Sequence, residues 1–168
     1  LPSKSHTPPE VDLPMPPIER KRSREHRMHA IFETSRGRIT ARLHRSDAPQ
    51  TVENFVKLAR ERFYDGTKWH RVIEHFVVQG GCPQGDGTGG PGWSIPLEHN
   101  ERKHERGSLA MARGRAEDSG GSQFYISRNR LPHLDGEYCV FGSVTAGLDV
   151  VDKLEPQDEL TRVTIIDL

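Results

Sequence analysis

Apolar and polar residues alternate over residues 28–43, and this pattern predicts a β-hairpin with one face turned to solvent. The alternating apolar positions are Ala30, Phe32, Ile39, Ala41 and Leu43. Between the two runs, Ser35-Arg36-Gly37 provides residues that can turn the chain. The first regular element after residue 28 is therefore expected to be a pair of antiparallel strands.

The apolar spacing changes after Asp47 to that of an amphipathic helix. The apolar residues follow one helical stripe at Val52, Phe55, Val56, Ala59 and Phe63. We expect Asp47 to cap the helix, with Pro49 in its first turn and Gln50 in the capping-box position. Tyr64-Asp65-Gly66 is expected to end it.

Strand patterns return after residue 66, separated by Gly, Pro, Asp or Asn. They predict strands at Lys68–Ile73, Phe76–Gln79, Ser108–Ala112, Gln123–Ser127, Tyr138–Val144 and Arg162–Asp167. A second helical stretch covers Leu148–Leu154. Many short strands with two helices indicate an all-β fold, a closed barrel or a sandwich. Closure is attractive because it leaves no sheet edge unpaired.

The first 27 residues differ from the rest of the chain. Half of the 12 prolines lie within the first 17 residues, and a basic run, Arg20–Arg24, follows. We expect residues 1–27 to be a Pro-rich, basic extension that adds little stability to a domain over residues 28–168. It is either a solvated linker or a docking element for an acidic partner or anionic lipid. We expect a cytoplasmic protein, although an exported form whose leader has been removed stays open, since the chain begins with Leu1.

Composition narrows the function. Lys plus Arg and Asp plus Glu are both 24, so the formal net charge is zero, which argues against a nucleic-acid binder. No apolar run approaches the roughly 18 residues of a membrane span. Two cysteines are too few for a disulfide scaffold, and the nine histidines form no zinc-binding motif, so no metal is expected.

Two glycine-containing motifs suggest functions that their surroundings do not support. Gly85–Gly90 fits the dinucleotide-binding pattern, but Pro91-Gly92 follows where a phosphate-binding helix must begin. We interpret it as a surface loop. Asp118-Ser119-Gly120-Gly121 is similar to the nucleophile loop of trypsin-like proteases, but the chain is too short for their two barrels.

The segment Trp69–Gly81, with sequence WHRVIEHFVVQGG, resembles the signature of cyclophilins, the cyclosporin-binding peptidyl-prolyl isomerases. Further blocks match in order at Ala48–Phe55, Gly87–Gly92, His104–Ala112, Gly121–Ile126 and Leu134–Gly142. The resemblance covers about residues 28–168, and residues 1–27 have no counterpart. It implies a closed, eight-stranded antiparallel barrel capped by two helices, in agreement with the pattern of strands and helices.

The resemblance also implies the site. It gives Arg71, Gln79 and Phe76 catalytic roles, with Arg71 as the catalytic arginine. The expected substrate-binding residues are Val77, Ala112, Arg113, Gln123, Tyr125, His133, Leu134 and Tyr138. Several depart from the residues that many members carry: Arg113 replaces Asn, Val77 replaces Met, Tyr125 replaces Phe, His133 replaces Trp and Tyr138 replaces His. We expect weak cyclosporin binding, and little effect at Arg113, where the backbone contacts peptide.

The implied reaction is rotation about X–Pro bonds, whose barrier of about 18–20 kcal/mol comes from amide resonance. No covalent bond breaks, so no cofactor is expected. Arg71 is the natural donor to the twisted amide, and the expected partners are proline-containing peptides and unfolded protein clients of a monomeric enzyme. The alternative is a non-catalytic module that binds proline peptides, with residues 1–27 as its targeting element.

Overall fold

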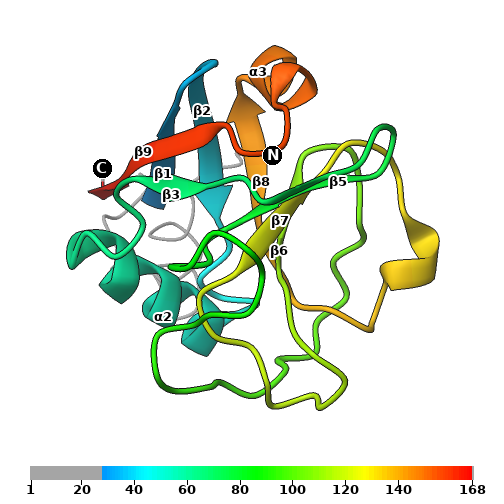
Figure 1. Ribbon diagram of the computed structural model, residues 1–168. Coiled ribbons are helices and arrows are strands. Elements are labelled where there is room, and N and C mark those ends of the chain that lie inside the picture. The colour runs from blue at the N-terminus through cyan, green and yellow to red at the C-terminus, as the bar shows by residue number, and fades with distance from the viewer. Residues whose placement is uncertain (1–27, 168) are drawn as a thin grey trace, which may run out of the picture.

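The computed structural model describes residues 28–167, whose nine strands form one curled antiparallel sheet (Figure 1). The strands are β1 (Met28–Thr34), β2 (Gly37–Leu43), β3 (Thr67–Lys68), β4 (Arg71–Val72), β5 (Val77–Gly80), β6 (Ser108–Met111), β7 (Phe124–Ser127), β8 (Val140–Ala146) and β9 (Glu159–Asp167). The helices are α2 (Pro49–Arg60), α3 (Leu148–Lys153) and the 3₁₀ turn η1 (Pro132–Leu134). The predicted extension at residues 1–27 lies outside the described residues.

The sheet runs in the order β3-β9-β1-β2-β8-β6-β7-β5-β4, so β3 and β4 stand at its two ends. Only Trp69 and His70 separate these strands in the chain. Counting them as one interrupted strand reduces the nine strands to eight around the ring. The predicted all-β antiparallel fold with two helices is thus confirmed.

The predicted strand Lys68–Ile73 is interrupted because Trp69 bonds outside the sheet. Its N–H donates to the Asp158 carbonyl, and its own carbonyl accepts from Gln157 N–H. The Trp69 ring is fully buried and packs edge-on against Phe124, with ring centroids 5.6 Å apart. The interruption therefore places a large aromatic side chain in the core while the chain passes from one end of the sheet to the other.

An aromatic cluster fills the interior of the curled sheet. Phe32, Phe55, Phe124 and Phe141 are fully buried, and Phe55 meets the other three at centroid distances of 5.3–5.9 Å. Phe55 comes from the predicted apolar stripe of α2, which lies across the lower end of the sheet, while α3 lies at the upper end (Figure 1). Packing of this stripe fixes the helix against the strands.

The predicted cap of α2 is wrong. Asp47 lies one residue before the N-cap position, which Ala48 occupies without a side-chain cap, and the Asp47 carboxylate accepts from Arg102 Nε at 2.7 Å. Glu98, from a distant loop, takes the capping role. Its carboxylate accepts from the backbone N–H groups of Gln50 at 3.0 Å and Thr51 at 2.6 Å, and from the Thr51 hydroxyl at 2.7 Å.

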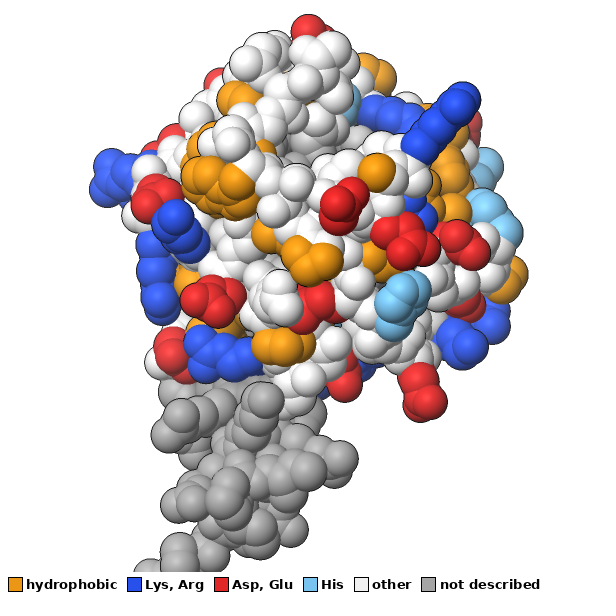
Figure 2. Space-filling model, turned by 90° about the horizontal axis from the view of Figure 1, so that it is seen from below, with side chains coloured by type: hydrophobic (Ala, Val, Ile, Leu, Met, Phe, Trp, Pro, Cys, Tyr) orange, Lys and Arg blue, Asp and Glu red, His pale blue; other side chains and the backbone are white. Residues whose placement is uncertain are grey.

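Charges of both signs are interspersed on the surface seen from below (Figure 2). Around the surface of residues 28–167, some opposite charges are paired, such as Arg106 with Asp152 at 2.8 Å and Arg130 with Glu105 at 2.8 Å. This arrangement agrees with the zero formal net charge. No helix within residues 28–167 is long and apolar enough to span a membrane.

Glu98→Ala should destabilise the fold, because it leaves three hydrogen-bond donors at the start of α2 without their acceptor. We expect a loss of about 1–2 kcal/mol in the free energy of unfolding, or roughly 3–6 °C in melting temperature. Thermal denaturation followed by circular dichroism measures it. Glu101→Ala, an exposed position in the same loop, is the control and should change the melting temperature by less than about 1 °C. Equal melting temperatures for both variants would contradict the capping role.

Candidate active site

A second apolar cluster lies on the outer face of the sheet, apart from the interior core. Along β5 and β7 successive side chains point to opposite faces. Val78, Phe124 and Ile126 belong to the interior core, whereas Val77 and Tyr125 belong to the second cluster. Its other buried members are Ala110, Leu131 and Val140, and the partly buried Phe76, Ala112, Leu134 and Tyr138 pack against it.

Strand register brings the candidate residues into one row. Arg71 on β4 pairs with Gln79 on β5, Gln79 pairs with Tyr125 on β7, and Tyr125 pairs with Ala110 on β6. Directly opposed residues of antiparallel strands share a face of the sheet. The exposed guanidinium of Arg71 therefore lies at one end of this row, beside the second apolar cluster.

This cluster encloses a cavity of about 130 Å³. The cavity is lined by Arg71, Phe76, Val77, Gln79, Ala112, Arg113, Tyr125, Leu134 and Tyr138. These are all the candidate residues except Gln123 and His133. One water takes about 30 Å³, so the cavity has room for a small ring. His133 is exposed at its rim and stacks on Phe76, with centroids 6.0 Å apart and planes at 18°.

A chain of amide contacts stands behind Arg71. Gln79 Nε2 donates to Gln123 Oε1 at 3.1 Å, and Gln123 Nε2 donates to the carbonyls of Gly87 and Gly89 at 2.9 Å. These bonds hold the side-chain oxygen of Gln79, Oε1, toward Arg71, whose Nη1 lies 3.4 Å away. That contact is long, so the guanidinium is directed toward the cavity without being locked. The glycine-rich loop supplies acceptors here.

Arg113 closes another side of the cavity with its side chain, which is only 11% exposed. Its Nε and Nη2 donate to the Glu137 carbonyl at 2.9 and 2.7 Å. The guanidinium carbon lies 4.8 Å from the centre of the Tyr138 ring, a cation–π contact. Arg113 thus fixes Tyr138 as a wall, a side-chain role that the sequence did not predict.

Two residues that the sequence analysis gave no role lie behind Tyr125. His104 is fully buried, with Nε2 2.7 Å from the Tyr125 hydroxyl and Nδ1 3.0 Å from Asp135 Oδ1. Burial lowers the pKa of His104, although Asp135 opposes this shift, and burial raises the pKa of Tyr125. The hydroxyl that Tyr125 has in place of the common Phe could have indicated such a partner from the sequence, because a buried hydroxyl requires a hydrogen-bonding partner.

A hollow of about 780 Å³ adjoins the cavity and shares Gln79, Ala112 and Arg113 with it. Residues 87–94, 119 and 121–123 form much of its wall. The cavity and the hollow together form a groove on the outer face of the barrel. The volume of the hollow is therefore additional space next to the cavity on the same face.

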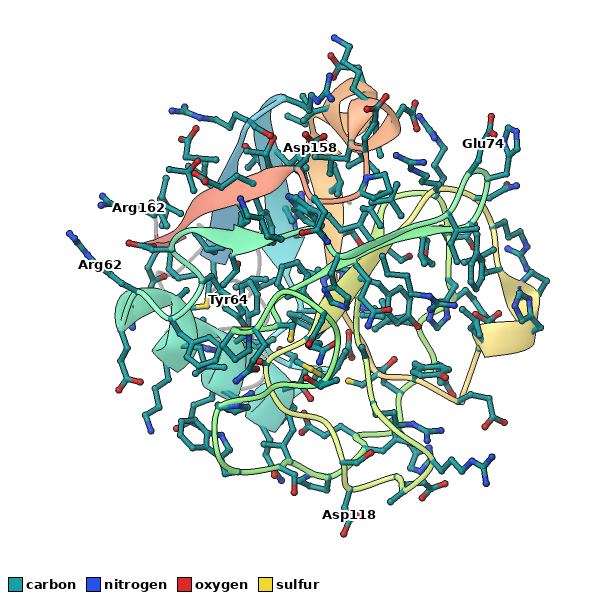
Figure 3. All side chains as sticks on the ribbon, viewed as in Figure 1. Arg62, Tyr64, Glu74, Asp118, Asp158 and Arg162 are labelled. Carbon is teal, nitrogen blue, oxygen red and sulfur yellow. The ribbon has the colours of Figure 1, made fainter. Side chains whose placement is uncertain are left out.

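The other candidate motifs have structural roles. Ser119 Oγ accepts from Gly114 N–H and donates to the Ala116 carbonyl, and Asp118 points outward at the tip of its loop (Figure 3). Cys82 and Cys139 are buried and unpaired. Within residues 28–167, no three His, Cys, Asp or Glu side chains gather as a metal site.

Comparisons with known proteins agree with the motifs. Residues 29–167 match the family described as "Cyclophilin type peptidyl-prolyl cis-trans isomerase/CLD". A peptidyl-prolyl cis-trans isomerase of Helicobacter pylori is 52% identical over 139 residues, which cover 80% of this chain and 85% of the relative. Peptidyl-prolyl cis-trans isomerase B of Bacillus subtilis is 48% identical over 130 residues, covering 76% of this chain and 90% of the relative.

Solved structures give the same result for the fold. A Cryptosporidium parvum cyclophilin-type isomerase, crystallised in the presence of the dipeptide Ala-Pro, superimposes with a TM-score of 0.78 at 30% identity. The match covers 82% of this chain and 98% of the solved one. The resemblance carried by the sequence motifs is confirmed, and the chain belongs to the cyclophilin-type peptidyl-prolyl cis-trans isomerases.

Proposed function

We propose that the enzyme grips the proline ring of an X–Pro peptide in the 130 Å³ cavity and stabilises the twisted amide with Arg71. The observation that carries this proposal is the composition of the cavity: apolar walls around a small space, with one exposed guanidinium at its edge. The Ala-Pro dipeptide in the C. parvum crystals supports a proline-containing ligand for this groove.

The chemistry needs little more than these two features. Twisting the X–Pro bond removes conjugation, and the prolyl nitrogen then becomes pyramidal with a lone pair that accepts a hydrogen bond. A guanidinium directed at that nitrogen stabilises the twisted state more than either planar isomer, which accelerates rotation. The isomers differ by only about 0.5–1 kcal/mol, so the reaction requires no energy source.

The substrates are proline-containing peptides and unfolded protein clients. The cavity opens on the outer face of the barrel and continues into the 780 Å³ hollow, so an extended chain can lie along the groove without being threaded. Val77, Phe76 and Leu134 present apolar surface to the pyrrolidine ring. Gln79, held by Gln123, is placed to orient the Arg71 guanidinium.

Arg71→Ala should lower kcat/KM for a short Ala-Pro-Phe peptide by at least about 10-fold, or 1.4 kcal/mol of transition-state stabilisation. A protease-coupled isomerase assay measures this. The melting temperature should hardly change, because the side chain is exposed. Arg62→Ala, where the side chain points outward beyond α2 (Figure 3), is the control. Turnover equal to wild type in Arg71→Ala would remove Arg71 from the mechanism. A wild-type protein that binds the peptide but does not isomerise it would instead be a binding module.

Arg113→Ala should raise KM for the same peptide about three- to tenfold and change kcat less than about twofold. The variant loses the cation–π contact and two hydrogen bonds that fix Tyr138, together about 1–2 kcal/mol. Steady-state isomerase kinetics separate the two parameters. Arg115→Ala removes an exposed charge two residues away and should leave KM unchanged. Identical KM values for the two variants would show that Arg113 does not shape the cavity.

Cyclosporin should bind weakly. A Trp in the place of His133 offers an indole N–H and a wide apolar face, whereas the smaller His133 ring lies over Phe76 at the rim. Having His133 in place of Trp should weaken the binding free energy of cyclosporin by about 1.5–3 kcal/mol, or roughly 10- to 100-fold in affinity. His133→Trp should recover that affinity and change kcat/KM only a few-fold, which titration calorimetry and the isomerase assay measure. Tight binding by the wild type would contradict the assignment of His133.

A further inference from the structure

His104 joins two walls of the cavity from behind. Its backbone N–H donates to Asp135 Oδ1 at 2.6 Å, and its carbonyl accepts from Leu131 N–H at 2.9 Å. Its ring nitrogens reach Asp135 Oδ1 at 3.0 Å and the Tyr125 hydroxyl at 2.7 Å. One fully buried residue thus bonds to a barrel strand and to both ends of the segment 131–135.

The two joined walls come from different parts of the chain, and both line the cavity. Tyr125 belongs to β7, where the interior core holds both of its neighbours in the chain. The segment 131–135 carries Leu134 of the cavity wall and His133 of its rim, and it lies in the connection between β7 and β8. Several of its own hydrogen bonds are local, such as Leu134 N–H to the Leu131 carbonyl. The segment is held toward β7 by the apolar packing of Leu131 and Leu134, and His104 adds the hydrogen bonds that connect it to Tyr125.

The hydrogen bonds that join Asp135, His104 and Tyr125 have a defined direction. Burial lowers the pKa of His104, so the ring is neutral at pH 7. Burial also disfavours the Asp135 carboxylate, but the hydrogen bonds from His104 outweigh it and lower the pKa of Asp135. A charged Asp135 accepts from Nδ1–H, which leaves Nε2 to accept from the Tyr125 hydroxyl. The hydroxyl is thereby directed away from the proline ring.

We propose that His104 is a positioning residue of the isomerase site, which sets the separation of the Tyr125 and Leu134 walls through its bonds to Tyr125 and Asp135. The inference rests on the proposed use of this cavity for proline. His104 does not line the cavity, so it acts only through those walls. Arg71 and the amide contacts of Gln79 and Gln123 belong to another part of the site. Loss of the bonds made by His104 should therefore lower the affinity for the peptide more than it lowers kcat.

The test uses variants that break single bonds. Tyr125→Phe removes only the hydroxyl. His104→Asn retains a donor in the place of Nδ1 for Asp135 but is too short for Tyr125, whereas His104→Gln places a polar atom near Tyr125. We expect Tyr125→Phe and His104→Asn each to raise KM, and the dissociation constant of an Ala-Pro peptide measured by NMR titration, about three- to tenfold. We expect kcat to change less than twofold and His104→Gln to recover at least half of the lost affinity.

The double variant His104→Asn/Tyr125→Phe gives the decisive measurement. If the two side chains act through one bond, it should bind the peptide no more weakly than either single variant. His44→Asn is the matched control, since His44 is also buried, with Nε2 2.8 Å from Ser143 Oγ on the β2–β8 side of the sheet. It should lower the melting temperature without changing the dissociation constant.

The proposal would be overturned if the double variant showed the product of the two single effects on the dissociation constant. It would also be overturned if His104→Asn lowered the melting temperature but left the peptide affinity unchanged. Should His104→Asn fail to fold, Tyr125→Phe alone decides, because an unchanged dissociation constant there excludes the link. Separate measurements of peptide affinity and turnover also distinguish failure of the proposed isomerase function from failure of the positioning role of His104. A wild type that binds the peptide without isomerising it defeats the proposed function, and the binding measurements still judge the positioning role.

Discussion

The whole site depends on the alternation of side chains along β5 and β7. Val78, Phe124 and Ile126 are fully buried in the aromatic core, so the two strands cannot shift without opening that core. Their neighbours along the chain, Val77 and Tyr125, point outward and acquire the same fixed positions. Close packing on one face of the sheet thus produces a rigid apolar surface on the other. A barrel whose interior is filled with side chains can therefore bind its substrate on the outside.

The parts of the site differ in how firmly they are held, and the difference suits the reaction. His104 is fully buried, and Arg113 is 11% exposed, so the walls of the cavity are fixed before substrate arrives. Arg71 is exposed, and its contacts are loose: Nη1 lies 3.4 Å from Gln79 Oε1, and the guanidinium carbon lies 5.8 Å from the centre of the Phe76 ring. In the proposed mechanism, a firm grip on the proline ring would keep one side of the X–Pro bond still while the other side rotates. In the same proposal, the loosely held Arg71 guanidinium would follow the prolyl nitrogen as that nitrogen becomes pyramidal.

Local patterns predicted the fold well, and contacts between distant segments account for what they missed. Alternation located the hairpin 28–43, and helical spacing located α2, because both periodicities lie within one segment. The resemblance supplied the residues that line the cavity. Spacing alone assigned the cap of α2 to Asp47, whereas Glu98 fills that role from 47 residues beyond Thr51. The bond between His104 and Tyr125 spans 21 residues, and no periodicity encodes such a pairing.

Two of the departures from the common family residues, Tyr125 and Arg113, come with bonded partners, and this changes what each substitution means. A tyrosine hydroxyl behind the proline cavity would be costly to bury alone, but His104 accepts it and Asp135 fixes the acceptor. The Arg113 guanidinium is likewise satisfied by the Glu137 carbonyl and the Tyr138 ring. Tyr125 and Arg113 are therefore members of local bonded groups, and restoring Phe at position 125 would leave the buried His104 without one of its partners. The shape of this cavity is consequently a property of these groups and cannot be derived from its lining residues one at a time.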